Sequence, residues 1–184
     1  WVKEAERRGL LNLRTAPDAL PHLLDQKNVD LFATHRVLSE AELRSRYEIH
    51  MEHYAKVVRI EALTMLDMAR KDILPGVCAY ERKLAETAAT KRNFLPGADY
   101  SVESALVDRL STLSACLYGR MNDLDAALTA SGDRREAKEL ALYERDHVLP
   151  AMRELRACAD ELETLTASDC WPYPGYGELL FGVH

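Results

Sequence analysis

The sequence predicts an all-α protein built as a long antiparallel helical bundle. Two observations carry this prediction. Apolar residues recur every three or four positions through three long stretches, which is the period of a helix face and not the alternation of a strand. Capping residues or Pro-Gly pairs separate these stretches. We therefore expect three major helices, the first of them kinked at Pro75, with an irregular helical segment before them and a proline- and aromatic-rich tail after them.

Residues 1–38 form the irregular segment. A helical fragment is expected to end at Gly9, and Thr15 is placed to cap a short helix that has Pro17 in its first turn. Pro21 marks another helix start. Turn signals are this dense in connecting segments and not in bundle helices, so we interpret residues 1–38 as a connecting or docking segment.

The first long helix is expected over residues 39–91. Ser39 and Glu42 have the spacing of a capping box, in which each side chain bonds the backbone N–H of the other residue. Pro75 removes one backbone hydrogen bond and presses on the carbonyl of Lys71, which predicts a kink or a break into two helices. The apolar stripe of this helix is Leu43, Tyr47, Met51, Tyr54, Val58, Ala62, Met65, Ala69 and Ile73.

The second long helix follows a loop at residues 93–99 and runs from Ser101 to about Ser131. Its stripe is Val102, Leu106, Leu110, Leu113, Leu117, Met121, Leu124 and Leu128.

A second capping box, Asp133 with Glu136, is expected to begin the third long helix. This helix runs to about Ala167 and carries its own proline, Pro150. Its stripe is Leu140, Tyr143, His147, Ala151, Leu155, Cys158, Leu162 and Leu165. Residues 39–167 therefore form the predicted bundle.

Residues 168–184 differ in kind from the bundle. Their prolines and glycines are incompatible with a long helix, and they are rich in aromatic side chains. Such a tail is expected to pack against the bundle, an upstream domain or a neighbouring subunit. The residues assigned to this docking tail are Trp171, Tyr173, Tyr176, Leu180 and Phe181.

Composition excludes several classes of partner. The net charge of −6 argues against a nucleic-acid backbone, and no apolar run approaches the ~20 residues of a membrane span. The four cysteines are scattered without a CxxC pair, so we expect reduced thiols in a cytoplasmic protein. The charged start does not read as a signal peptide, and a first residue of Trp1 leads us to expect that the chain is the tail of something longer.

Histidines offer the only candidates for a metal or catalytic site. His50 and His53 lie three residues apart on the first long helix, but no second cluster supplies further ligands, so a solvated helix face is the favoured interpretation. Glu144 and His147 match the Glu-x-x-His motif of di-iron bundles once; a second copy is absent, which argues against such a centre. His147 is expected to be a hydrogen-bonded core histidine.

Several long strings resemble the C-terminal region of the type III glutamine synthetases. They are WVKEAERRGLLNLRTAPDALPHLL at residues 1–24, LSEAELRSRYEI at 38–49, IEALTMLDMARKDILP at 60–75, LPAMRELRACADELETL at 149–165 and WPYPGYGELLF at 171–181. They stand in family order and together extend over nearly the whole chain.

The resemblance implies a parent enzyme that ligates ammonia to glutamate with ATP and a divalent metal such as Mg²⁺. The family's catalytic motifs cannot be placed on this sequence. We therefore expect no catalytic, cofactor-binding or metal-binding residue in this segment, and no activity from it alone. The family forms large rings of subunits, so the expected partners are the protein's own catalytic domain and neighbouring subunits in a homo-oligomer.

Two functions remain open at this point. In the first, the chain is a non-catalytic helical domain that serves assembly and docking, with residues 10–24 as the hinge to the catalytic body. In the alternative, it is a regulatory or protein-interaction bundle that senses a ligand or partner.

Overall fold

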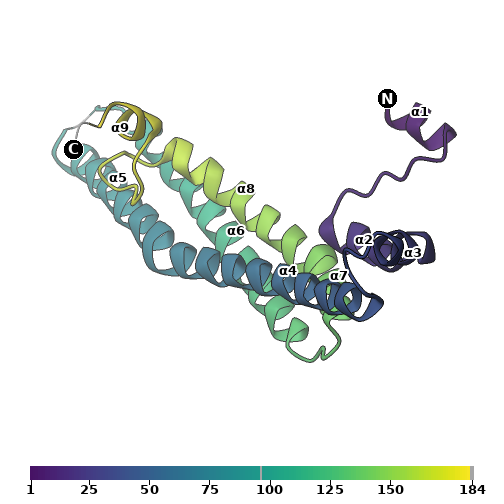
Figure 1. Cartoon of the computed structure of the whole chain (residues 1–184). Helices are drawn as coiled ribbons and strands as arrows, with labels where there is room; N and C mark the ends of the chain where they lie inside the picture. Colours follow the sequence, from purple (N-terminus) through teal and green to yellow (C-terminus); the bar gives the residue numbers. More distant parts are fainter. Residues whose placement is uncertain (96, 183–184) are drawn as a thin grey trace. The chain divides into compact units, whose positions relative to one another are not determined.

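The computed structural model describes residues 1–95 and 97–182 and confirms the all-α fold (Figure 1). Within these residues every regular element is helical. The elements are α1 (Val2–Arg7), α2 (Ala16–Ala19), η1 (Leu20–Leu24), α3 (Gln26–Thr34), α4 (Glu40–Met68), η2 (Ala69–Ile73), α5 (Leu74–Phe94), α6 (Ser101–Ser131), α7 (Ala137–Tyr143), η3 (Glu144–Val148), α8 (Leu149–Leu165) and α9 (Tyr176–Phe181).

The chain divides into two compact units. Unit 1 consists of Trp1–Glu61 and Thr129–Leu149. Unit 2 consists of Ala62–Leu128 together with the chain from Pro150 onward. The division into a connecting segment, a bundle and a tail, with boundaries after residues 38 and 167, stays a prediction.

The capping box at the start of α4 is present. The Ser39 amide donates to Glu42 Oε2 at 2.7 Å, and the Glu42 amide donates to Ser39 Oγ at 3.3 Å. The pKa of the Glu42 carboxyl lies below its ordinary value because the carboxyl accepts hydrogen bonds from both the amide and the hydroxyl of Ser39. Two backbone donors that a helix start leaves without partners are thereby satisfied.

The perturbation expected at Pro75 takes the form of a π turn. The five residues of η2 form a wider turn that ends immediately before the Leu74-Pro75 pair. The chain then stays helical through α5 to Phe94. In a regular α-helix the proline ring would press on the carbonyl of Lys71. A π turn adds one residue, which moves that carbonyl out of the way of the ring.

The same device recurs before the second Leu-Pro pair. The π turn η3 also has five residues and ends one residue before Leu149 and Pro150. Both helices therefore accommodate an internal proline by widening in the preceding turn.

The predicted start of the third long helix is wrong. Asp133 does not cap it; the N-cap is Glu136 and α7 begins at Ala137. Arg134 is instead held in the preceding turn, where its Nη1 donates to the Ala130 carbonyl and its guanidinium lies 3.4 Å from the centre of the Tyr143 ring. This cation–π contact replaces the helical position that the sequence pattern assigned to Arg134.

In unit 1, a small apolar cluster joins α4 to α7. Met51 and Ala55 are buried against Ala141. Arg145, in η3, forms an ion pair with Asp18 in α2. The side chains that pack around the cluster are Leu20, Tyr47, Tyr54, Ala137 and Leu140.

In unit 2, α5, α6 and α8 lie side by side (Figure 1). Polar contacts between helices show that neighbours run antiparallel, because higher residue numbers on one helix meet lower numbers on the next. The contacts from α6 to η2 and α5 are Asp125 with Arg70, Ser114 with Glu81 and Glu103 with Lys91. Those from α6 to α8 are Arg109 with Glu161 and Arg120 with Glu154.

The core of unit 2 follows the predicted apolar stripe of α6. Leu110, Leu117 and Leu124 are fully buried at intervals of one heptad. They are joined by Val77 from α5 and Leu162 from α8. Regular burial of this kind stabilises helices that would not persist alone.

Candidate interaction site

The C-terminal tail is fastened to unit 2 by residues 168–174. Tyr173 donates its hydroxyl to Asp72 Oδ2 at 2.9 Å, and Lys83 forms an ion pair with Asp169 at 2.6 Å. Burial and the neighbouring Asp72 carboxylate together raise the pKa of Tyr173 to about 12. The Lys83 ammonium lowers the pKa of Asp169 below its ordinary value. These contacts hold the first half of the tail on η2 and α5.

Gly76 permits the closest approach between the tail and α5. A Cβ built on this glycine would lie only 2.5 Å from the Cys170 carbonyl oxygen and 3.6 Å from Cδ of Pro172. The carbonyl belongs to the backbone and cannot rotate away as a side chain would. The tail can therefore lie this close to α5 only because residue 76 has no side chain.

Trp171 and Tyr173 pack edge to face, with ring centroids 6.4 Å apart and planes at 77°. The two rings border a pocket of about 550 Å³. Its other walls come from Ser168, Pro172, Pro174, Glu178, Leu179 and Gly182. The first two predicted docking residues thus build the base from which α9 extends.

The remaining predicted residues lie on α9 and are turned outward. The exposed fractions of Tyr176, Leu180 and Phe181 are 83%, 71% and 80%. Leu179 is 65% exposed and belongs to the same surface, although the sequence analysis did not select it. Its position three residues after Tyr176 is the signal that could have identified it. Glu178 fixes the start of this helix, because its Oε2 accepts from the Gly175 amide at 2.9 Å.

Exposed apolar side chains also occur in the segment assigned as a hinge. Leu10 and Leu11 are 51% and 63% exposed in the stretch that follows α1. Thr15 caps α2 as expected, with its Oγ1 accepting from the Asp18 amide at 3.4 Å. The role of residues 10–24 as a hinge stays a prediction.

An apolar groove of about 610 Å³ lies in unit 1. His50, His53 and Glu61 are the polar groups that line it. Among the described residues, no group of three His, Cys, Asp or Glu side chains is arranged to hold a metal ion. The apolar lining comes from Ala16, Leu20, Leu23, Tyr54, Val57, Val58 and Leu149.

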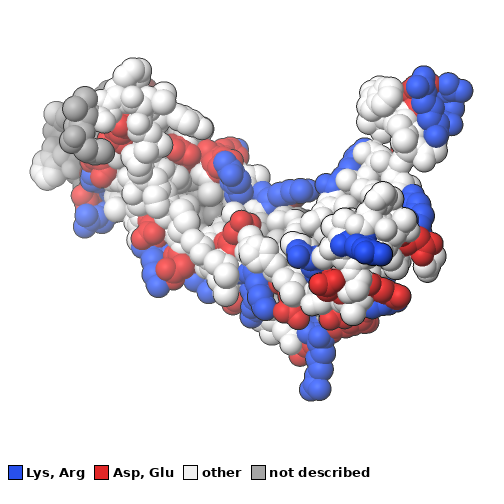
Figure 2. Space-filling view, in the orientation of Figure 1, with Lys and Arg blue, Asp and Glu red and all other residues white. Residues whose placement is uncertain are grey.

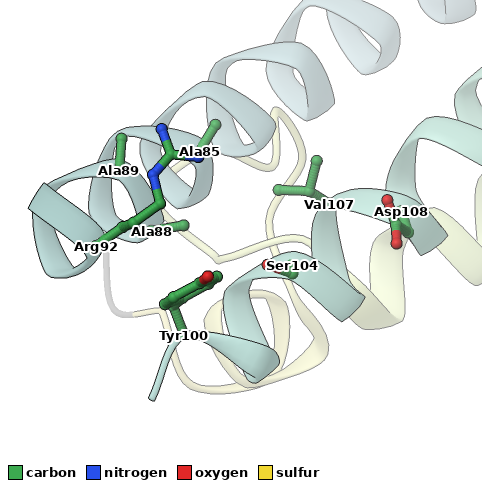
Figure 3. Close-up of a pocket in the computed structure, with 8 residues that line it drawn as sticks. All are labelled: Ala85, Ala88, Ala89, Arg92, Tyr100, Ser104, Val107 and Asp108. Atoms are coloured by element: carbon green, nitrogen blue, oxygen red, sulfur yellow. The ribbon is translucent and has the colours of Figure 1, made fainter. Parts of the chain in front are cut away.

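A smaller pocket of about 270 Å³ lies between α5 and α6 in unit 2 (Figure 3). Alanines of α5 line one side and the first turns of α6 the other. Arg92 and Tyr100 lie at one end and Asp108 at the other (Figure 3). Its size and alanine-rich wall leave little room for a ligand of ordinary dimensions.

Glu144 is an unusual group whose burial the sequence pattern did not indicate. It lies in η3 and is fully buried, and within residues 1–95 and 97–182 neither carboxylate oxygen has a partner at full hydrogen-bond geometry, although the Ser131 hydroxyl is close enough to lower its pKa. Burial raises the pKa of Glu144 above its ordinary value, against the opposing effects of Ser131, Arg59 and Arg134. Arg59 itself donates to Ser131 Oγ at 2.9 Å. The cluster places a buried acid beside two cations.

His147 is not the core histidine that the sequence predicted. It is exposed and stacks on Tyr143, with ring centroids 4.3 Å apart. The predicted stripe is one position early from its first member, because Ala141 in α7 is fully buried whereas Leu140 is only partly buried. Glu144 and Val148 therefore occupy the interior in place of Tyr143 and His147.

Charge is mixed on one face of the protein (Figure 2). Figure 2 shows Lys and Arg interspersed with Asp and Glu on the face in view. No helix among residues 1–95 and 97–182 has both the length and the apolar character that crossing a bilayer requires.

These features define an all-α domain with exposed aromatic side chains on a fastened C-terminal tail. The family model for the glutamine synthetase C-terminal domain matches residues 1–92. The chain therefore belongs to the glutamine synthetase C-terminal domain family, which confirms the resemblance found in the sequence.

Three relatives match along nearly the whole chain. A glutamine synthetase of Butyrivibrio fibrisolvens is 38% identical over 183 residues, which cover 100% of this chain and 26% of the relative. The type-3 glutamine synthetase of Dictyostelium discoideum is 32% identical, covering 98% of this chain and 25% of the relative. A glutamine synthetase of Bacteroides fragilis is 30% identical with the same coverage. The chain thus spans about a quarter of the length of the curated relatives it matches.

Proposed function

We propose that this chain is the non-catalytic C-terminal helical domain of a type III glutamine synthetase and that it serves oligomer assembly and docking to the catalytic body. The observation that carries the proposal is the outward apolar face of α9, where Tyr176, Leu180 and Phe181 are 71% to 83% exposed. An apolar group of this kind at the end of a fastened tail is typical of a contact surface.

The energetic scale suits a contact between subunits or domains. Fully burying a large apolar side chain is worth about 1.5–3 kcal/mol. Burial of the α9 side chains therefore supplies on the order of 5 kcal/mol before the entropy of ordering is subtracted. Such a contact stabilises an assembly in which many copies repeat it and is weak when made once.

The parent reaction belongs to this proposal as well. By membership in the family, the full-length protein is expected to ligate ammonia to glutamate with ATP and Mg²⁺ in the cytoplasm, with the ligands bound outside this chain. A glutamine synthetase assay of the 184-residue chain alone should show no turnover. Turnover by the isolated chain would overturn the non-catalytic assignment.

Truncation of the full-length protein after Gly175 tests the role of α9. This cut removes the exposed side chains but keeps the contacts of Asp169 with Lys83 and of Tyr173 with Asp72. We expect light scattering to show smaller particles, or thermal unfolding at a lower temperature. Unchanged particle mass together with unchanged thermal stability would contradict the proposal.

A matched pair of single substitutions separates the tail from general surface effects. Tyr176→Ser removes an aromatic ring from α9, and Tyr118→Ser removes one from the middle of α6, where the ring is 57% exposed. We expect the first substitution to weaken assembly and the second to leave it unchanged. Equal effects of the two would show that α9 has no special role.

A second candidate function is a regulatory bundle that senses a ligand. The groove of unit 1 favours it, because its volume of about 610 Å³ lies within the range of small-molecule sites. The test measures the melting temperature of the full-length protein with and without glutamine, ATP or 2-oxoglutarate. The same measurements are made on a variant with Val57→Glu in the groove. A shift that the substitution abolishes would support sensing in this groove, and an equal shift in both proteins would assign binding elsewhere.

A further inference from the structure

Two of the four cysteines face each other between α6 and α8 in unit 2. The ion pair between Arg120 and Glu154, with 3.4 Å between Nη2 and Oε2, fixes the register of these antiparallel helices. Cys116 lies one helical turn before Arg120, and Cys158 lies one turn after Glu154. On antiparallel helices, one turn backward in sequence on the first helix and one turn forward on the second lead in the same direction in space. The ion-pair register therefore places Cys116 opposite Cys158.

A second ion pair joins the same two antiparallel helices on the other side of the thiols, within one helical turn of this register. Arg109, two turns before Cys116, forms an ion pair with Glu161, which follows Cys158 by three residues. The two thiols thus lie between two cross-links that hold the same pair of helices together. This arrangement keeps them near each other even though the individual exposed ion pairs contribute little free energy.

The two thiols have different environments. Cys116 is exposed, whereas Cys158 is 8% exposed. Burial, followed by the neighbouring Cys116 thiol as a hydrogen-bond partner, raises the pKa of Cys158 to about 11. Both cysteines are free thiols in the structure. An exposed thiol beside a buried one is the arrangement in which the first meets an oxidant and the second resolves the product.

We propose that Cys116 and Cys158 form a reversible peroxide-sensitive dithiol, in which oxidation at Cys116 leads to a disulfide that joins α6 to α8. This modification site goes beyond the function proposed above and does not depend on it. The oxidant is a hydroperoxide, and hydrogen peroxide serves as the probe.

The chemistry proceeds in two balanced steps. The Cys116 thiolate attacks one peroxide oxygen, so that an S–O bond forms, the O–O bond breaks and the departing hydroxide takes up a proton to become water. Cys158 sulfur then attacks the sulfenic sulfur of Cys116; an S–S bond forms, and the S–O bond breaks. The hydroxide that departs takes the proton of Cys158 and leaves as a second water.

Exposure favours the first step at Cys116, because a peroxide can reach this thiol from the solvent. A thiol reductant reverses the second step by exchange and restores both cysteines.

The test uses the full-length protein, treated with hydrogen peroxide and then alkylated under denaturing conditions. Trypsin cuts after Arg109, Arg120 and Arg156, which isolates Cys116 but leaves Cys158 and Cys170 on one peptide. A second cleavage after Glu161 and Glu163 separates those two cysteines. We expect mass spectrometry to find the peptides of Cys116 and Cys158 joined, with the loss of two hydrogen atoms, and to find them separate after reduction.

Two variants make the test decisive. Cys116→Ser changes an exposed residue and should leave Cys158 reduced and open to alkylation after peroxide. Cys78→Ser, at another exposed cysteine, should leave the joined pair unchanged. The proposal would be overturned if wild-type protein treated with peroxide contained no joined peptide, or if Cys158 lost its alkylation to the same extent in the Cys116→Ser variant.

Discussion

Tyr173 and Asp72 connect the tail to a π turn. The tyrosine hydroxyl donates to Asp72 Oδ2 at 2.9 Å, and Asp72 lies within η2, the turn that accommodates Pro75. The π turn that precedes Pro75 thus contains the carboxylate that accepts the hydrogen bond from the tail. The tail residue that makes this bond lies three positions before α9 begins.

Tyr173→Phe removes this hydrogen bond while keeping the ring against Trp171. We expect the free energy of opening the tail to fall by about 1 kcal/mol, because a hydrogen bond to a partly exposed charged group contributes on this scale. Amide hydrogen exchange of residues 168–174 in the full-length protein measures it. Trp171→Phe, which keeps the bond and alters the packing, serves as the control; unchanged exchange in Tyr173→Phe would show that the bond contributes nothing.

Alkaline pH should release the same contact. The pKa of Tyr173 is about 12 in the folded protein, above its ordinary value of 10.0. A raised pKa means that the neutral phenol is favoured by folding, so its stabilisation is complete below pH 10.0 and disappears as the pH rises toward about 12. The difference in phenolate absorbance between wild type and Tyr173→Phe should show one group that titrates near the higher value. A difference that titrates near the ordinary value would contradict the contact.

Gly76→Ala should displace the tail from α5. The new Cβ would lie 2.5 Å from the Cys170 carbonyl oxygen, a backbone atom that cannot move without the tail. We expect a net loss of roughly 1–3 kcal/mol, because overpacking on this scale outweighs the gain in helix propensity. Hydrogen exchange in residues 168–174 should rise.

Gly119→Ala is the matched control for that substitution. Gly119 also lies inside a long helix, α6, but no atom of the part of the chain that the structure describes lies within 4 Å of the Cβ that alanine would add. The same chemical change should therefore stabilise α6 by about 0.5–1 kcal/mol. Stabilisation by both substitutions would show that the tail does not rest on Gly76.

Much of the fold was predictable because it depends on local rules. The capping box at Ser39 and the extent of the helix that begins at Ser101 follow from residue types and spacing alone. The family could also be inferred, from strings in collinear order. These features require no knowledge of which segments meet in space.

The π turns were beyond the reach of the sequence pattern. A fixed helical period cannot indicate where one residue is added. The predicted stripe was also one position early before η3 begins, since Ala141 is fully buried and Leu140 only partly so. Tyr143 and His147 were assigned to the interior, whereas Glu144 and Val148 are buried. The burial of an acid in this turn contradicts the usual preference of carboxylates for water, which is why pattern analysis passed over it.

The division of the tail into two halves also required the structure. The sequence treated Trp171 and Phe181 as members of one docking group. Contacts distant in sequence, from Asp72, Gly76 and Lys83, fasten residues 168–174 and leave α9 exposed. Contacts of this kind cannot be deduced from the composition of the tail. The assembly role of α9 itself remains the proposal made above.

Glu144→Gln should stabilise unit 1 at neutral pH. Burial raises the pKa of Glu144 above its ordinary value of 4.5, so the folded protein favours the uncharged acid. The contribution of the uncharged Glu144 to folding stability is complete below pH 4.5. It is lost as the pH rises, because ionisation is easier in the unfolded chain, where water solvates the carboxylate, than in the interior. Glutamine keeps the shape of the side chain and removes the charge.

Hydrogen exchange of η3 in the full-length protein measures the effect. At pH 7 we expect opening of η3 to cost about 1 kcal/mol more in Glu144→Gln than in wild type, because a buried charge without a partner costs more than a buried neutral amide. The difference should shrink as the pH is lowered toward 4.5, the ordinary value of this carboxyl. Glu139→Gln, at an exposed position of α7, should change neither result. Destabilisation by Glu144→Gln at pH 7 would show instead that Arg59 and Arg134 stabilise a charged carboxylate in this turn.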